Sequence, residues 1–384
     1  MAEVKPSIET FAKIRVIGIG GAGGNAINRM IENGIKGVEF IAINTDIQAL
    51  QYNKAEKKLH IGKAVTRGLG AGMNPELGKQ AAEESQNEIR ELLKDSDMVF
   101  ITCGLGGGTG TGASPVVAEI AKDLGSLTVA FVTKPFSFEG GQRKNLADNG
   151  YENLASNVDT IIVISNDKLL QIIDKQTSLL DAFLTADDIL RQGVQGIAEI
   201  ITVPGVINAD FADVKAVMSN SGSALMGIGQ ADGENKAIEA AKAAVSSPLL
   251  DMSIDGAKGV VFTITGGVNL GMTEVNEAAK LITDSADPEA KVIFGAVIDS
   301  EMKDEIKVTV VATGFINNQN NVKDSSGSDN YRMNSFVEEE KKRDLLKSPF
   351  STKVSSNDNK IDDLSDLEDE DLGVPTFIRK KMGK

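Results

Sequence analysis

The sequence of 384 residues contains one histidine, one cysteine and no tryptophan. With Cys103 alone, an intramolecular disulfide is impossible, and a reducing compartment is favoured. A Ser-His-Asp triad, a Cys-His dyad or a zinc site with several histidines would each have to be built on His60. The hydrolases and metalloenzymes that depend on such sites are therefore disfavoured from the outset.

Basic surface and long apolar runs are also scarce. Lys and Arg number 40 against 55 Asp and Glu, a formal net charge of −15, whereas a general nucleic-acid binder needs positive charge for the phosphates. No apolar run approaches the roughly 18 residues of a membrane helix. Residues 1–12 form a polar lead without the apolar core of a secretory signal. We expect a cytoplasmic protein that binds no nucleic acid and reaches a membrane only indirectly.

Glycine, in contrast, is abundant, with 39 residues. Two glycine clusters, residues 20–24 and 104–112, directly follow the apolar runs Ile14–Ile19 and Asp97–Gly104, and each leads into a helical pattern. Further apolar runs typical of buried strands are residues 38–43, 127–133 and 160–166. This order of strand, glycine loop, helix and strand predicts an α/β fold, with a Rossmann-like parallel sheet over residues 13–176. The two helices after the loops are expected over residues 25–34 and 114–125.

The pattern changes three times after this domain. A long helical pattern covers residues 177–203, and residues 204–316 combine helices with alternating strands, which predicts a second α+β domain. Residues 317–365 are polar and are expected to be a disordered linker. Residues 366–384 are acidic and then end on LGVPTFIRKKMGK. Apolar side chains beside a basic end indicate a peptide that a partner buries.

The two glycine loops predict phosphate binding with different strength. Gly18, Gly20 and Gly23 fit the dinucleotide fingerprint, although close packing of helix on strand explains the same spacing. The run GGGTGTG at residues 106–112 is more specific, because backbone amides without side chains can wrap an anion closely. Neither loop has the Lys-Ser/Thr of a P-loop, and an NAD enzyme would not need the second loop. A nucleotide with a long phosphate tail fits both.

Five segments together resemble the FtsZ family of bacterial cell-division GTPases, in the tubulin superfamily. They are GGAGGNA, INTDIQAL, GLGGGTGTGASPVVAEIA, KPFSFEG and NADFADV. The resemblance runs from about Ile14 to Phe315 and resumes in DLGVPTFIRKK. It implies GTP hydrolysis on assembly, head-to-tail filaments that form the division ring at mid-cell, and Mg²⁺ with the nucleotide, although no residue cluster demands a metal.

The resemblance also implies which positions contact GTP or GDP. It assigns the two glycine loops to the phosphates, and other positions to the rest of the nucleotide. The phosphate positions are Gly21, Ala22, Gly23, Gly24, Asn25, Gly107, Gly108, Thr109, Gly110 and Thr111. The other positions are Asn44 and Asp46 at the nucleotide-facing end of the second strand, Glu139 and Arg143 for the ribose and phosphates, and Asn166, Phe183 and Asp187 for the base. An acid suits guanine, because N1–H and the 2-amino group both donate hydrogen bonds.

Simpler interpretations of several of these residues stay open. Glu139 and Arg143 are four apart, so they could form an ordinary helical salt bridge. The Asn and Asp of INTD could be a turn signal at the end of a strand. Phe183 could belong to the core, and Asp187 to a solvated helix face.

The glycine loops offer no group that could activate water for hydrolysis. The resemblance implies that a loop of the next subunit supplies it, through Asn208, Asp210 and Asp213. From the residue types alone, the two acids are better explained as a helix N-cap and as a first-turn acid that the helix dipole stabilises.

Two other functions compete with a ring-forming GTPase. One is a nucleotide-gated structural polymer with incidental hydrolysis, as in plasmid segregation or cell shape, and the other is an NAD-dependent enzyme. The segment Leu372–Lys381 argues against a plasmid or cell-shape role, because it resembles the peptide by which the FtsZ family binds partners such as an FtsA-type membrane tether.

Overall fold

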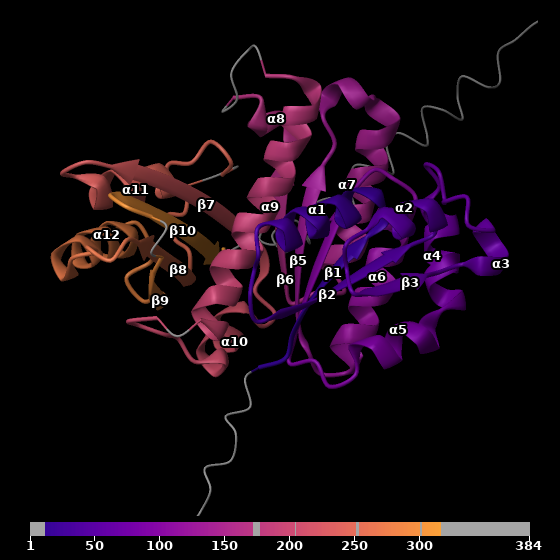
Figure 1. The fold of residues 1–384 in the computed structure, drawn as a ribbon, viewed down its shortest axis with the longest axis horizontal. Helices are drawn as coiled ribbons and strands as arrows, with labels where there is room; N and C mark the ends of the chain where they lie inside the picture. The colour runs from indigo at the N-terminus through magenta and orange to yellow at the C-terminus, as the bar shows by residue number, and fades with distance from the viewer. Residues whose placement is uncertain (1–11, 172–176, 204, 251–252, 300–301, 316–384) are drawn as a thin grey trace, which may run out of the picture. The chain divides into compact units, whose positions relative to one another are not determined.

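A computed structural model describes residues 12–171, 177–203, 205–250, 253–299 and 302–315 (Figure 1). The expected polar lead, apart from Ala12, and the expected linker and C-terminal peptide lie outside the described residues. Within the described ranges, no helix is long and apolar enough to cross a membrane.

The described part of the chain contains one ten-stranded sheet in the order β3-β2-β1-β4-β5-β6-β7-β10-β8-β9 (Figure 1). Strands β1 to β6 pair in parallel, which confirms the expected α/β class and the parallel sheet. Their bounds are β1 Ile14–Ile19, β2 Val38–Asn44, β3 Lys57–His60, β4 Met98–Gly104, β5 Leu127–Lys134 and β6 Thr160–Ser165.

Strand β1 shows why these strands, apart from β3 at the edge of the sheet, are continuous apolar runs. Ile14 and Val16 face one layer of helices, whereas Ile17 and Ile19 face the other. Both faces are buried, so neither needs polar residues. The first layer contains α1 Gly20–Glu32 and α9 Leu179–Thr202. The second contains α4 Pro75–Glu84, α5 Gln86–Leu93, α6 Thr109–Asp123 and α7 Gly141–Ala155.

Helices α1 and α6 begin five residues earlier than the sequence pattern indicates, at Gly20 and Thr109. Pro115 therefore lies inside α6 rather than at its start. Glycine and proline are poor helix formers, but tertiary packing overrides that preference here. A Cβ on Gly112 would lie 1.9 Å from the carbonyl oxygen of Pro75, so only glycine lets α6 approach α4 this closely.

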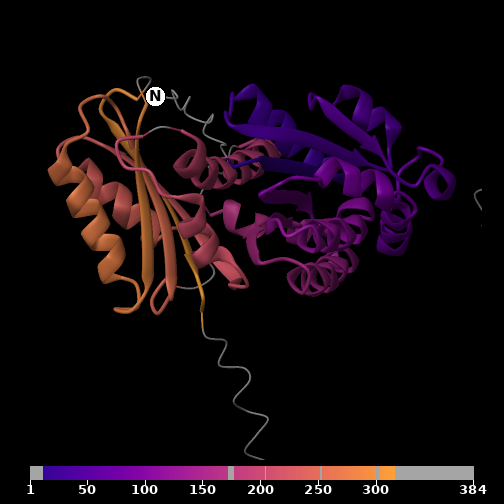
Figure 2. The ribbon, with the colours of Figure 1, turned by 90° about the horizontal axis from the view of Figure 1, so that it is seen from below.

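A second group of strands follows the long helix. Strand β7 pairs with β10, and β10 with β8, in antiparallel fashion, whereas β8 and β9 are parallel. Helices α11 and α12 cover one face of these strands (Figure 2), and α9 lies against the other through Val261 and Val311. The bounds are β7 Gly222–Asp232, α11 Lys236–Val245, β8 Gly259–Gly266, α12 Met272–Asp284, β9 Lys291–Ile298 and β10 Glu305–Thr313.

The sequence pattern missed β7, and its glycines explain why. A Cβ on Gly227 would lie 1.9 Å from the carbonyl oxygen of Ala244, and one on Gly229 would lie 2.0 Å from that of Ala240. Helix α11 thus presses on the strand where glycine interrupts its apolar pattern. The remaining short elements are α2 Ile47–Tyr52, α3 Lys63–Thr66, η1 Ser137–Glu139, α8 Asn166–Leu169 and α10 Phe211–Met218.

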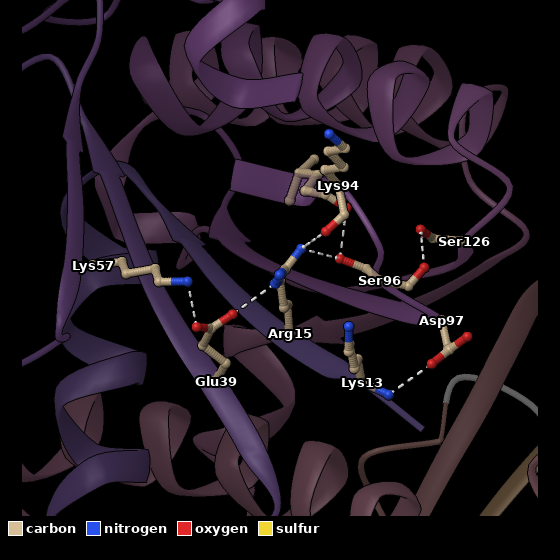
Figure 3. Close-up of polar contacts among 9 residues, drawn as sticks. Lys13, Arg15, Glu39, Lys57, Lys94, Ser96, Asp97 and Ser126 are labelled. Carbon is tan, nitrogen blue, oxygen red and sulfur yellow. Dashed lines mark hydrogen bonds and ion pairs between the residues drawn. The ribbon is translucent and has the colours of Figure 1, made fainter. Parts of the chain in front are cut away.

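An ionic cluster joins the strands near their amino ends (Figure 3). The Arg15 Nε donates to Glu39 Oε2 at 2.6 Å, and its Nη1 donates to Ser96 Oγ and to the Lys94 carbonyl, each at 2.6 Å. Lys57 on β3 forms an ion pair with the same Glu39. The cluster therefore holds β1, β2, β3 and the turn before β4 together, away from the carboxyl ends of the strands.

We expect Glu39→Gln to lower the free energy of unfolding by about 1 kcal/mol near neutral pH, a value limited by solvent screening of a partly exposed carboxylate. Burial raises the pKa of Glu39, but hydrogen bonds from Lys57 and Arg15 outweigh it, so the pKa lies below 4.5. The stabilisation is therefore present above that value and is lost as pH falls through the lower folded pKa. Urea unfolding should show the variant and the wild type converging in acid. Glu56→Gln, an exposed glutamate before β3, should behave as wild type throughout.

Candidate nucleotide-binding site

The sheet order places a crevice between the carboxyl ends of β1 and β4. Strand β1 continues toward β2 on one side, and β4 toward β5 on the other, so the chain diverges at this point. Helices α1 and α6 both begin there. Neither has a side-chain N-cap hydrogen bond, and neither has an acid in its first turn. Their free amides and partial positive charges suit an anion.

A cavity of about 350 Å³ lies at this position. It brings together residues from the two glycine loops, from η1 and α7, and from α8 and α9. The sequence-predicted residues that line it are Gly21, Ala22, Gly107, Gly108, Thr109, Gly110, Glu139, Arg143, Asn166, Phe183 and Asp187. The residues that line it and were not predicted include Gly72, Gly104, Leu105, Thr133, Pro135 and Ala186. Thr133 and Pro135 had a usable signal, because they sit where β5 ends on the same edge as the two loops.

The glycines of the two loops have different tasks. A Cβ on Gly21 or Gly107 would meet no atom within 4 Å, so both leave room for a ligand. A Cβ on Gly23, however, would lie 2.3 Å from the carbonyl oxygen of Thr102, and one on Gly110 would lie 2.8 Å from that of Gly104. In each loop, therefore, one glycine allows close packing of the backbone and another leaves open space for a ligand.

The two hydroxyls of GGGTGTG are both hydrogen-bonded within the chain. The Thr109 and Thr45 hydroxyls lie 2.6 Å apart, which links the start of α6 to the residue that follows β2. The Thr111 hydroxyl accepts from the Gly106 amide at 2.9 Å. Thr111 lines a separate hollow of about 720 Å³ between α4, α6 and α7 rather than the phosphate crevice. It shapes the loop from behind.

Several predicted phosphate and ribose positions lie beside the main cavity. Gly24, Asn25 and Asn44 line an adjoining hollow of about 140 Å³, which shares Gly21 with the main cavity. Asp46 caps α2, and its carboxylate accepts from two amides of the first turn at 2.8 and 3.2 Å. The turn-signal interpretation therefore describes the hydrogen bonds that Asp46 makes here.

Glu139 and Arg143 form a salt bridge and also line the cavity. The two interpretations of this pair are compatible, because Glu139 lies in η1 and Arg143 in the first turn of α7. The Phe136 amide donates to Glu139 Oε1 at 3.0 Å, so the carboxylate is held from both sides. The arrangement presents a guanidinium, which suits phosphate oxygens, and a carboxylate, which suits ribose hydroxyls.

The residues of α8 and α9 that line the cavity suit a flat, polar ring. Phe183 is 39% exposed and contacts Phe136 edge-on, with ring centroids 5.4 Å apart. Asn166 is buried, and its Oδ1 has no hydrogen-bond partner among the described residues. It is therefore available to a donor on the ligand. Asp187 lies one turn along α9 from Phe183 and faces the same cavity. An aromatic face, an acceptor and a carboxylate match a guanine base.

Burial raises the pKa of Asp187 to about 7, although the positive charge of Arg29 opposes the shift. A carboxylate that accepts from guanine must be ionised, so we expect GDP affinity to fall by roughly tenfold per pH unit below this pKa. The stability of the protein without nucleotide changes in the opposite direction. Because the pKa of Asp187 is raised, the free energy of unfolding falls as pH rises from 3.8 to about 7. Calorimetric GDP titrations near pH 8 and pH 6 test this. In Asp187→Asn the affinity should be weak and should not change with pH. An equal pH slope in that variant would contradict the assignment.

The structure places the Asn208–Asp213 loop outside this cavity. Phe183 and Asp187 lie in the first turns of α9, and the loop follows its last residue, Thr202. At about 1.5 Å per residue, the helix separates Asp187 from Thr202 by about 22 Å. In Figure 1, α8 and α10 accordingly lie at opposite ends of α9. One chain does not bring the loop to its own nucleotide cavity.

Within the loop, the polar side chains are exposed. Asn208 Oδ1 accepts from the Gly205 amide at 2.7 Å, and Asp210 Oδ1 accepts from the Ala212 amide at 3.0 Å as the N-cap of α10. Asp213 lies in the first turn of α10. The capping interpretation of Asp210 thus holds within one chain. Asp213 is exposed, and its side chain forms no hydrogen bond with the other described residues.

The described residues contain no group of three or more His, Cys, Asp or Glu that could hold a metal ion. A Mg²⁺ ion that accompanies the nucleotide would therefore be held chiefly by phosphate oxygens and water, as is usual for this ion.

A parallel sheet with two uncapped helix N-termini at its crevice, and an aromatic ring and a carboxylate of α9 beside them in one cavity, defines a nucleotide-binding α/β protein with a second domain. Two family models match it. The Tubulin/FtsZ family GTPase domain matches residues 13–174, and the FtsZ family C-terminal domain matches residues 222–316.

Solved structures agree with these matches. An empty FtsZ dimer from M. jannaschii is 51% identical over 80% of this chain and 89% of its own, with a TM-score of 0.77. A point mutant of that FtsZ is also 51% identical, over 80% of this chain and 92% of its own, with a TM-score of 0.77. GDP-bound CetZ1 from Haloferax volcanii shares the fold at 21% identity over 79% and 95%, with a TM-score of 0.68. The chain belongs to the FtsZ family. It is a GTPase that binds GTP and GDP, with Mg²⁺ expected beside the nucleotide.

Proposed function

We propose that this GTPase assembles head-to-tail into filaments that form the bacterial division ring at mid-cell, in the cytoplasm. The observation that carries the proposal is the position of the nucleotide cavity and the acidic loop at opposite ends of α9. A contact that brings the loop of one subunit to the cavity of the next uses two different surfaces. Such contacts extend into filaments when their rotation does not close a ring.

The chemistry supports the same arrangement. Of the acids that line the cavity, Glu139 is held by Arg143 and Asp187 lies on the base side. The terminal phosphate would lie at the N-termini of α1 and α6, and neither helix has an acid in its first turn. Asp210 and Asp213 of the next subunit would orient and activate water there, with Asn208 beside them. GTP then favours assembly, and hydrolysis weakens the contact that made it possible.

The proposal assigns each part of the chain a task. Residues 13–176 bind the nucleotide, residues 177–203 form the central helix, and residues 204–316 carry the acidic loop and the second domain. The linker, residues 317–365, gives reach to the C-terminal peptide, residues 366–384. Within that peptide, Leu372–Lys381 would bind an FtsA-type membrane tether and other division proteins.

Truncation at about Ser365 should abolish binding to such a tether while GTP hydrolysis stays within about twofold of wild type, since the described residues that line the cavity all precede the cut. Fluorescence anisotropy with purified FtsA, beside a phosphate-release assay, measures both. A chain with a scrambled linker but an intact C-terminal peptide is the matched control and should bind as wild type. Equal FtsA binding by the truncated chain would refute the assignment of the peptide.

Sedimentation with GTP, with GDP and without nucleotide tests the filament itself, with phosphate release measured in the same samples. We expect pelleting and hydrolysis only with GTP, and a rate per subunit that rises with protein concentration because the site forms between subunits. A concentration-independent rate without pelleting would refute assembly-coupled hydrolysis. If the protein pellets with GTP but the rate of phosphate release per subunit does not change with protein concentration, a structural polymer with incidental hydrolysis would be favoured.

A further inference from the structure

Asp167 is a carboxylate that does not line the nucleotide cavity but is bonded to an element that does. It lies in the short helix α8, next to Asn166. Its Oδ1 accepts from the Ser137 amide at 2.8 Å, and its Oδ2 accepts from the Ser137 hydroxyl at 2.5 Å. Both oxygens thus bind one residue that lies 30 positions earlier in the chain. Ser137 is the first residue of η1.

The bonds continue from Ser137 to the cavity. The η1 turn ends on Glu139, whose carboxylate accepts from the Phe136 amide and from Arg143. Asp167 therefore stands at the start of a series of hydrogen bonds that runs through η1 to the salt bridge at the cavity wall.

The other described contacts of the η1 turn are with its own neighbours in the chain. Phe138 stacks on Phe136 with ring centroids 4.9 Å apart, and Glu139 bonds to the Phe136 amide and to Arg143. The η1 element is a 3₁₀ turn of three residues, a conformation with weak internal hydrogen bonding. Gly140, which follows it, has a positive φ of 101°, a conformation that glycine adopts readily. Phe138 is 62% exposed and contributes little burial. Phe136 is buried and anchors one side, so the carboxylate of Asp167 supplies the other anchor.

We infer that Asp167 is a positioning residue for nucleotide binding, which fixes η1 so that Glu139 and Arg143 keep their places at the cavity. This inference rests on the proposed role of that pair in the nucleotide site. In this arrangement α8 contributes to nucleotide binding twice, because Asn166 faces the base while Asp167 holds the η1 turn. A charge-assisted pair of hydrogen bonds is strong enough to decide the geometry of so short a segment.

GDP affinity, measured by titration calorimetry at protein concentrations that do not support assembly, tests the inference. Asp167→Ala should raise the Kd for GDP about tenfold, since a charge-assisted contact is lost and the Ser137 amide is left without its partner. Asp167→Asn keeps an oxygen acceptor for that amide and should rescue part of the loss. In steady-state assays, the effect should fall on KM for GTP, with kcat at saturating GTP within about twofold of wild type.

Asp97→Ala is the matched control. Asp97 Oδ2 also accepts from the backbone amide of a distant residue, Lys13, at 2.8 Å, but at the amino ends of β1 and β4 (Figure 3). It should leave the Kd for GDP unchanged. If Asp167→Ala changes the Kd no more than Asp97→Ala does, the positioning role is wrong.

A double-mutant cycle with Arg143→Ala separates this inference from the proposed site. If Asp167 acts through the salt bridge, Arg143→Ala should cost several-fold less in the Asp167→Ala background than in wild type. Additive losses would refute action through Arg143. If Arg143→Ala itself leaves the Kd unchanged, the assignment of that residue to the nucleotide site fails, whatever Asp167 does.

Discussion

Replacing Asp213 with alanine should lower GTP hydrolysis in assembled filaments at least about 100-fold, the usual contribution of a group that activates water. Sedimentation with GTP should persist, because the side chain is exposed and belongs to the first turn of α10. Loss of a first-turn acid costs α10 at most about 1 kcal/mol. The two assays therefore separate a catalytic loss from unfolding or failed assembly.

Glu239→Ala is the matched control, because Glu239 is an exposed acid in the first turn of α11. It should hydrolyse GTP as wild type does. Phosphate release at the wild-type rate in sedimenting Asp213→Ala filaments would show that the loop does not supply the catalytic group, and would favour the structural polymer with incidental hydrolysis.

Mixing variants tests whether the site is shared between subunits. Asp213→Ala keeps its cavity, and Arg143→Ala keeps its acidic loop. In a random equal mixture, about a quarter of the head-to-tail contacts pair an intact cavity with an intact loop, so part of the activity should return. A site within one chain would recover nothing on mixing.

The second large effect separates two glycines of the same signature. Gly112→Ala should lower the free energy of unfolding by about 3 kcal/mol, because the added methyl group would overlap the carbonyl oxygen of Pro75 and force α6 away from α4. Gly107→Ala should leave stability unchanged, since its Cβ meets no atom within 4 Å. It should instead weaken GDP binding by about tenfold, because its methyl group would narrow the crevice for the phosphates.

Urea unfolding and GDP titration of both variants give this comparison. Gly141→Ala, with an open Cβ position at the start of α7 and outside the lining of the cavity, is the control for stability. Equal loss of stability at Gly112 and Gly107 would contradict the division of tasks within the loop.

Much of the fold could be predicted because its cause is local. Strands β1, β2, β4, β5 and β6 are short apolar runs, and that pattern is visible in the sequence. Strand β3, with the sequence KKLH at the edge of the sheet, has no such pattern and was not predicted. The start of α6 and the strand β7 could not be predicted in the same way. Their glycines meet carbonyl oxygens of α4 and α11, which are distant in the chain. Residue types alone do not show which glycine has a neighbour and which has open space.

The site shows the same division. The cavity brings together Arg143, Asn166 and Asp187, which the resemblance had assigned to the nucleotide. Thr111 and Asp46, assigned by the same reasoning, do not line that cavity, and their side chains form hydrogen bonds within the glycine loop and at the cap of α2. Side-chain direction separates these groups, and it depends on the packing of whole helices. Asp167 carried no motif at all, since its partner Ser137 is close only in space.

The long helix α9 also has a consequence for the dimensions of the filament. It is about 36 Å long at 1.5 Å per residue. As a single rigid rod it fixes the distance between the nucleotide cavity of a subunit and the acidic loop that reaches the next subunit. The length of α9, rather than the linker or the bound partners, then sets the axial repeat of the filament. Inserting one helical turn into α9 should lengthen that repeat by up to about 5 Å or, where the neighbouring strands cannot follow, abolish assembly.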